Sequence, residues 1–112
     1  MTTSLTDPFK DWERTAAAAK RMVDDLISRL PDEVRPEAHR IGYELRKRCQ
    51  DGETTLGEYF KSAHLIILYL ETIRDDCAAE GFDYERQVEK TYLHELGHHL
   101  GLGEDEVARL GV

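Results

Sequence analysis

Two histidines near the C-terminus have the spacing of a metal site. They open and close the segment 94–98, which reads H-E-x-x-H. On an α-helix, residues four positions apart lie about 40° apart around the axis, so the imidazoles of His94 and His98 can reach one Zn²⁺ ion at about 2.0–2.1 Å. Glu95 lies about 100° from His94, where a general base can take a proton from metal-bound water. The pattern therefore predicts a hydrolytic zinc site.

The residues that follow this segment supply candidates for a third ligand. Gly101 can adopt the left-handed conformation that ends a helix and turns the chain back. Glu104, six residues after His98, could then return to the ion and complete a site of two histidines and one carboxylate with an open fourth position. Asp105 competes for the same role, because spacing alone does not determine how a tight turn aims its side chains.

The same helix has an apolar face opposite the two histidines. With His94 at 0° and 100° per residue, His98 falls near 40°. The apolar residues fall between about 120° and 240°, and they are Val88, Tyr92, Leu96 and Leu100. The helix can therefore bury one face and present the other to a cleft. His99, near 140°, is expected to be a packed histidine beside the site, and Gly97 to be a point of close packing.

A long N-terminal helix is predicted over residues 8–30. Pro8 suits the first turn of a helix, and Pro31 stops it. Apolar residues recur at intervals of three and four, as on one helical stripe: Trp12, Ala16, Ala19, Val23, Leu26 and Leu30. We expect this helix to cover the core.

The segment 38–48 fits two structures. An alternating pattern, which favours a half-buried strand, is formed by Ile41, Tyr43 and Leu45. A helical stripe, which favours a helix, is formed by Val34, Ala38, Ile41 and Leu45. Gly42 weakens both interpretations, and the strand is preferred.

The remaining elements lead up to the motif. Residues 56–60 predict a short strand, and the apolar run 64–70 predicts a strand buried on both faces. Residues 71–80 predict a helix, which Gly81 ends, and Asp83 can cap the last helix. The order of helix, strands and two helices indicates an α+β fold.

Composition excludes several classes of protein. The 112 residues carry a net charge of −8, which divides into +1 over residues 1–50 and −9 over residues 51–112. The basic run 46–48 is too short for a nucleic-acid-binding face, so no nucleic acid is expected. No apolar run approaches the roughly 20 residues of a membrane span, and no secretory signal opens the chain. Cys49 and Cys77 lack CxxC spacing, which suits reduced thiols and a cytoplasmic location, with a single disulfide left open.

The segment 94–106, HELGHHLGLGEDE, resembles the H-E-x-x-H-x-x-G-x-x-D/E ending of the bacterial minimal zincin-like metallopeptidases. A weaker resemblance upstream covers Leu56–Tyr59 and Ile66–Tyr69, which look like the paired strands of that family. The resemblance implies a small α+β domain with a short β-sheet packed on the motif helix. The length of 112 residues predicts one domain over residues 1–112. The resemblance implies that its core at 31–112 is metallopeptidase-like and that the helix at 8–30 is an addition. The site residues that it implies are the zinc ligands His94, His98 and Glu104 and the general base Glu95.

We therefore expect a zinc-dependent hydrolase acting on peptide or protein substrates. Tyr59, Tyr69 and His64 are candidates to polarise the substrate carbonyl, although packing within the fold explains each more simply. The strand at 64–70 could offer an edge to an extended peptide. Two alternatives stay open: zinc that serves folding or a protein partner without catalysis, and an acidic interaction module that binds no metal.

Overall fold

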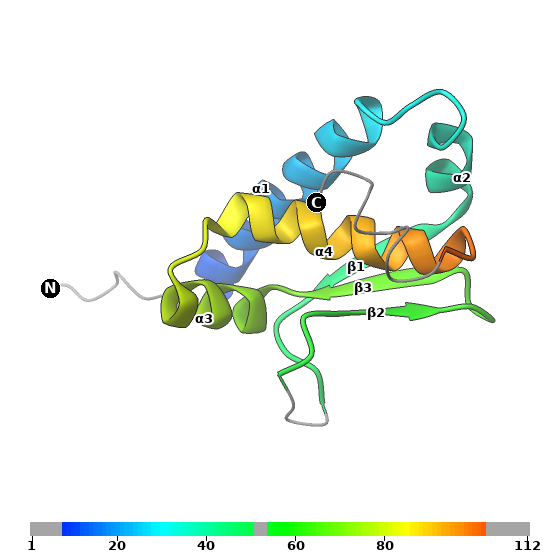
Figure 1. Cartoon of the computed structure of the whole chain (residues 1–112). Coiled ribbons are helices and arrows are strands. Elements are labelled where there is room, and N and C mark those ends of the chain that lie inside the picture. The colour runs from blue at the N-terminus through cyan, green and yellow to red at the C-terminus, as the bar shows by residue number, and fades with distance from the viewer. Residues whose placement is uncertain (1–7, 51–53, 103–112) are drawn as a thin grey trace, which may run out of the picture.

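The computed structural model describes residues 8–50 and 54–102 (Figure 1). Over these residues, four helices and three strands make an α+β domain, which confirms the expected class. In chain order the elements are α1 (Pro8–Ser28), α2 (Arg35–Arg40), β1 (Gly42–Arg46), β2 (Gly57–Phe60), β3 (Leu65–Tyr69), α3 (Leu70–Glu80) and α4 (Tyr84–His99).

The strands form a mixed sheet in the order β1-β3-β2. β3 pairs in parallel with β1, with Tyr43 opposite Ile66, and antiparallel with β2, with Tyr59 also opposite Ile66. The prediction of a strand buried on both faces at 64–70 is confirmed over Leu65–Tyr69, whereas His64 lies in the preceding turn and Leu70 begins α3. The edge considered for that strand is wrong, because β3 is hydrogen-bonded on both sides. β1 and β2 are the outer strands of the described sheet.

α1 confirms the predicted N-terminal helix. It begins at Pro8 and ends at Ser28, two residues before the predicted end. Ala19 and Val23 are fully buried, and the helix lies on the same side of the sheet as α4 (Figure 1). α1 therefore covers the core, as its apolar stripe indicated.

The single strand preferred for residues 38–48 is wrong in its first part. The short helix α2 occupies residues 35–40, and β1 starts at Gly42. Pro36 lies in the first turn of α2, where its missing N–H costs nothing, and Ala38 is buried. The helical stripe thus corresponds to α2 and the alternating pattern to β1, and Ile41 lies between the two elements.

Apolar side chains form two clusters on opposite faces of the sheet. The larger cluster lies between the sheet and the helices, and it includes Ile66, Leu68 and the apolar face of α4. The smaller cluster lies on the outer face and consists of Cys49, Ile67 and Tyr69. Cys77 belongs to the larger cluster, and both thiols are free and buried.

The two C-terminal helices are joined by a tight turn. α3 matches the prediction for 71–80, and Ile73 and Cys77 face the core. Gly81 is left-handed, with φ at 77°, and ends α3. Within the part of the chain that the structure describes, no helix is both long and apolar enough to cross a membrane.

Candidate metal centre

α4 is held in one rotational orientation. At its start, the Asp83 carboxylate accepts a hydrogen bond from the backbone N–H of Arg86 at 2.9 Å, which confirms the predicted cap. Val88, Tyr92 and Leu96 are fully buried along one side. Because this apolar face is packed against the core, the opposite face of the helix points outward.

The two histidines of the motif converge on that outward face. The Nε2 atoms of His94 and His98 lie 3.2 Å apart, and the ring centroids lie 4.7 Å apart at an interplanar angle of 83°. Two nitrogens bound to one tetrahedral zinc ion at about 2.0–2.1 Å would lie about 3.3–3.4 Å apart. The separation also permits a hydrogen bond between the rings. The distance between the two nitrogen atoms therefore matches the spacing of two ligands on one tetrahedral zinc ion.

Glu95 and His94 line one groove between α4 and the start of β2. The groove has a volume of about 250 Å³. Glu95 is only 9% exposed, so its carboxylate belongs to the inner wall, whereas His98 is exposed. The other residues that line the groove are Leu56, Gly57, Gln87, Lys90 and Thr91. The motif therefore places a carboxylate and an imidazole beside a space that a substrate segment can enter.

Gly57 sets the width of this groove, a role that was not predicted from sequence. A Cβ atom at position 57 would lie 2.8 Å from Cγ2 of Thr91 and 3.1 Å from the carbonyl oxygen of Ile67. Only a residue without a side chain lets β2 approach α4 this closely. Close packing was predicted for Gly97, which is buried. The available signal was a glycine within a predicted strand, which often marks a close approach of another segment.

The end of α4 has the predicted left-handed turn. Gly101 has φ at 76°, its N–H donates to the carbonyl of His98 at 3.0 Å, and the Leu102 N–H donates to the carbonyl of Gly97 at 3.0 Å. These two bonds form the Schellman motif, which reverses the chain after a helix.

The two candidates for the third ligand, Glu104 and Asp105, lie outside the described residues. Over residues 8–50 and 54–102, no group of three or more His, Cys, Asp or Glu side chains could hold a metal ion. The described chain thus provides the two nitrogen donors of the motif.

His99 is packed beside the motif, as predicted. Its Nδ1 is hydrogen-bonded to the Tyr59 hydroxyl at 3.0 Å, and its Nε2 lies 3.4 Å from Oε1 of Glu37. The side chain is 13% exposed. His99 therefore ties the last turn of α4 to β2 and α2, and the hydroxyl of Tyr59 is already engaged.

The other two candidate polarisers lie in different surroundings. The Tyr69 hydroxyl donates to Oε1 of Glu58 at 2.6 Å on the outer face of the sheet, away from α4. Burial raises the pKa of Tyr69 most, and the hydrogen bond to Glu58 raises it further. His64 is exposed in the turn before β3, with φ at 49°, and its ring contacts that of His99 edge-on. Tyr69 is therefore a packing residue rather than a candidate for the site.

Similarity to known proteins lies in the C-terminal part of the chain. Residues 49–112, more than half of the chain, match the family model described as zincin-like metallopeptidase. The match includes β2, β3, α3 and α4, and thus both walls of the groove. No curated protein is significantly similar to the chain.

Proposed function

Because this chain belongs to the zincin-like metallopeptidase family, we propose that it is a zinc-dependent peptidase with its active site in the groove between α4 and β2. In this proposal His94 and His98 bind the metal, Glu95 is the general base and Glu104 is the third ligand. The observation that carries it is the convergence of the two Nε2 atoms, 3.2 Å apart, beside the wall that holds Glu95.

In this proposal the zinc ion and Glu95 have separate roles in peptide hydrolysis. When bound, Zn²⁺ lowers the pKa of a coordinated water to near 7 and polarises a carbonyl oxygen. Glu95 accepts a proton from the attacking water and later gives it to the leaving amine. Since Glu95 is buried in the wall of the groove, its carboxylate is held in place before a substrate arrives.

We propose that β2 positions the peptide backbone. It is an outer strand of the described sheet, and its first residue, Gly57, lines the groove together with the preceding Leu56 and with His94. An extended peptide can add to such a strand through backbone hydrogen bonds. The peptide-binding edge in this proposal is therefore β2 and not the strand at 64–70. A peptide added to β2 would have its scissile bond beside Glu95.

The first test measures metal content. The purified protein should bind about one equivalent of zinc, and His94→Ala and His98→Ala should each lower that affinity strongly. Zinc well below one equivalent after loading would refute both metal-dependent functions and leave an acidic interaction module. Comparing Glu104→Ala with Asp105→Ala identifies the third ligand, because only the variant that removes a ligand should lose zinc affinity.

The second test separates catalysis from a structural metal. Glu95→Gln keeps the size and polarity of the side chain and removes the base, so it should retain zinc and melt at nearly the same temperature. Its peptide hydrolysis should fall by roughly 10²–10⁴-fold. Equal hydrolysis by Glu95→Gln would contradict the role of the base. Zinc binding without cleavage of any peptide by the wild type would favour a zinc-stabilised interaction domain.

A further inference from the structure

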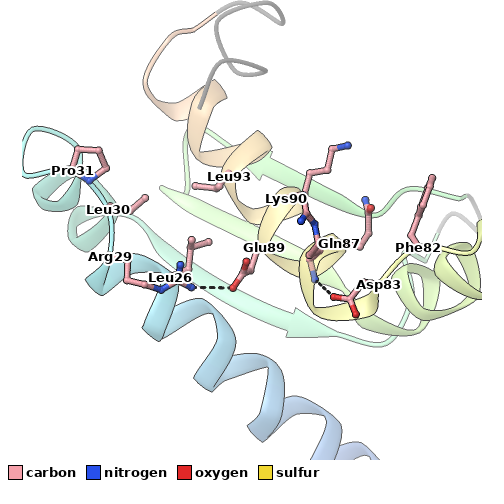
Figure 2. Close-up of a pocket in the computed structure, with 11 residues that line it drawn as sticks. Leu26, Arg29, Leu30, Pro31, Phe82, Asp83, Gln87, Glu89, Lys90 and Leu93 are labelled. Carbon is pink, nitrogen blue, oxygen red and sulfur yellow. Dashed lines mark hydrogen bonds and ion pairs between the residues drawn. The ribbon is translucent and has the colours of Figure 1, made fainter. Parts of the chain in front are cut away.

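The groove beside His94 carries a positive charge that no described residue neutralises. Lys90 lies one helical turn before His94, is exposed, and lines the same groove. No ion pair or hydrogen bond joins its ammonium group to the described part of the chain. Arg29, directly after α1, is by contrast paired with Glu89 of α4 at 3.1 Å (Figure 2). Lys90 therefore offers its charge to a bound molecule.

Lys90 and Glu95 lie on different sides of the groove. At 100° per residue they are 140° apart around α4, with His94 between them. Glu95 is 9% exposed and belongs to the inner wall, whereas the exposed Lys90 belongs to the outer rim. A peptide in the groove would thus meet the base on one side and the ammonium group on the other.

The groove continues along α4 into a larger hollow. This hollow of about 570 Å³ shares Gln87 and Lys90 with the groove (Figure 2). Arg86, four residues before Lys90, lines it as well, is exposed, and has no ion pair with any described side chain. Asp83 and the paired Arg29 and Glu89 line the hollow too, so Arg86 and Lys90 are its cations without an ion pair to a described side chain.

We propose that Lys90 selects peptides with an acidic side chain one or two residues from the cleaved bond, on the side toward the start of α4. This inference rests on the proposed peptidase function. Lys90 and His94 are four residues apart, or about 6 Å along the helix axis. An extended peptide advances about 3.3 Å per residue. A carboxylate beside Lys90 therefore belongs to the first or second residue from the bond that lies beside His94.

The net charge of −8 does not decide this preference. Charges more than about 10 Å apart are largely screened at 0.1 M salt. An ion pair formed within the groove is screened less, because the protein and the peptide exclude part of the solvent. Lys90 therefore acts on a peptide in the groove more strongly than the acidic side chains of the distant surface do.

The test uses fluorogenic peptides that differ only in Glu, Gln or Lys at one of the two positions on each side of the cleaved bond. With the zinc-loaded protein, kcat/KM should be about threefold higher for Glu than for Gln, and about tenfold higher for Glu than for Lys, at one of these positions. Lys90→Glu should reverse the order. Arg21→Glu, an equal change of charge on the exposed side of α1, should preserve it.

A second measurement keeps the inference separate from catalysis. Fluorescence anisotropy with Glu95→Gln, in the wild-type and Lys90→Glu backgrounds, measures binding of the same peptides without cleavage. Equal binding of the Glu and Lys peptides, or a preference that persists in Lys90→Glu, would overturn the role of Lys90 even if peptides are cleaved. An acidic preference in binding would support it even if the wild type cleaved nothing, in which case the proposed peptidase function would fail alone.

Discussion

Replacing Gly57 with alanine tests how closely β2 lies against α4. The added Cβ atom would meet Cγ2 of Thr91 at 2.8 Å, the carbonyl oxygen of Ile67 at 3.1 Å and Cδ2 of Leu68 at 3.3 Å. All three distances are shorter than the roughly 3.5–4.0 Å of favourable contacts. Forcing one extra carbon into such a space costs about 1–3 kcal/mol.

A smaller effect opposes this loss. Alanine has less backbone freedom than glycine in the unfolded chain, which favours folding by about 0.4–1 kcal/mol. Overpacking is the larger effect, so Gly57→Ala should lower the free energy of unfolding by about 1–2 kcal/mol. Urea denaturation followed by circular dichroism, in chelator, measures this value without a contribution from bound metal.

Two further variants show whether the clash is the cause. Gly42→Ala is the matched control, because the nearest atom to its new Cβ is Cδ1 of Leu65 at 3.7 Å, an ordinary contact, so its stability should stay within about 0.5 kcal/mol of the wild type. Thr91→Ser removes the closest methyl group and keeps the hydroxyl that donates to the Gln87 carbonyl at 2.7 Å.

The double variant Gly57→Ala/Thr91→Ser should therefore be more stable than the sum of its single changes predicts, by about 1 kcal/mol. The close approach of β2 to α4 would be refuted if Gly57→Ala were as stable as Gly42→Ala. Strict additivity in the double variant would also refute it, because the Thr91 methyl group would then not be the obstacle.

Two other predictions concern titratable side chains. The Tyr92 hydroxyl is buried without a hydrogen-bond partner among the described residues, and burial raises its pKa to about 12. Tyr92→Phe should therefore stabilise the fold by about 1 kcal/mol at neutral pH, and it should reduce the loss of stability as pH rises from about 10 toward 12, both measured by urea denaturation across pH. Asp24 accepts hydrogen bonds from Lys20 and, at 2.6 Å, from the Tyr43 hydroxyl, and these bonds hold its pKa below the usual value. Ionised Asp24 therefore stabilises the fold above about pH 4, and this stabilisation is lost as the pH falls. Asp24→Asn should accordingly cost more stability at pH 6 than at pH 2.5, and an equal cost at both values would contradict the bond between α1 and β1.

The last helix could be predicted from sequence because its features are local. The cap at Asp83, the left-handed turn at Gly101 and the apolar stripe through Tyr92 each depend on residues within a few positions of one another. The same holds for the spacing of His94 and His98, which the helix converts into converging nitrogen atoms. Helical hydrogen bonds join residues four positions apart, so the sequence window and the structural unit coincide.

The groove depends on contacts between distant residues. Gly57 meets Thr91, and His99 binds Tyr59 across 40 residues, so neither contact appears in any local pattern. The central place of β3 in the sheet could not be predicted from the sequence either. An apolar run indicates that a strand is buried, but it does not indicate which strands pair with it. The sequence by itself determined which residue types stand on one face of α4. Only the tertiary structure decided that β2 forms the opposite wall, because pairing of strands and packing of a sheet on a helix are settled by the whole chain at once.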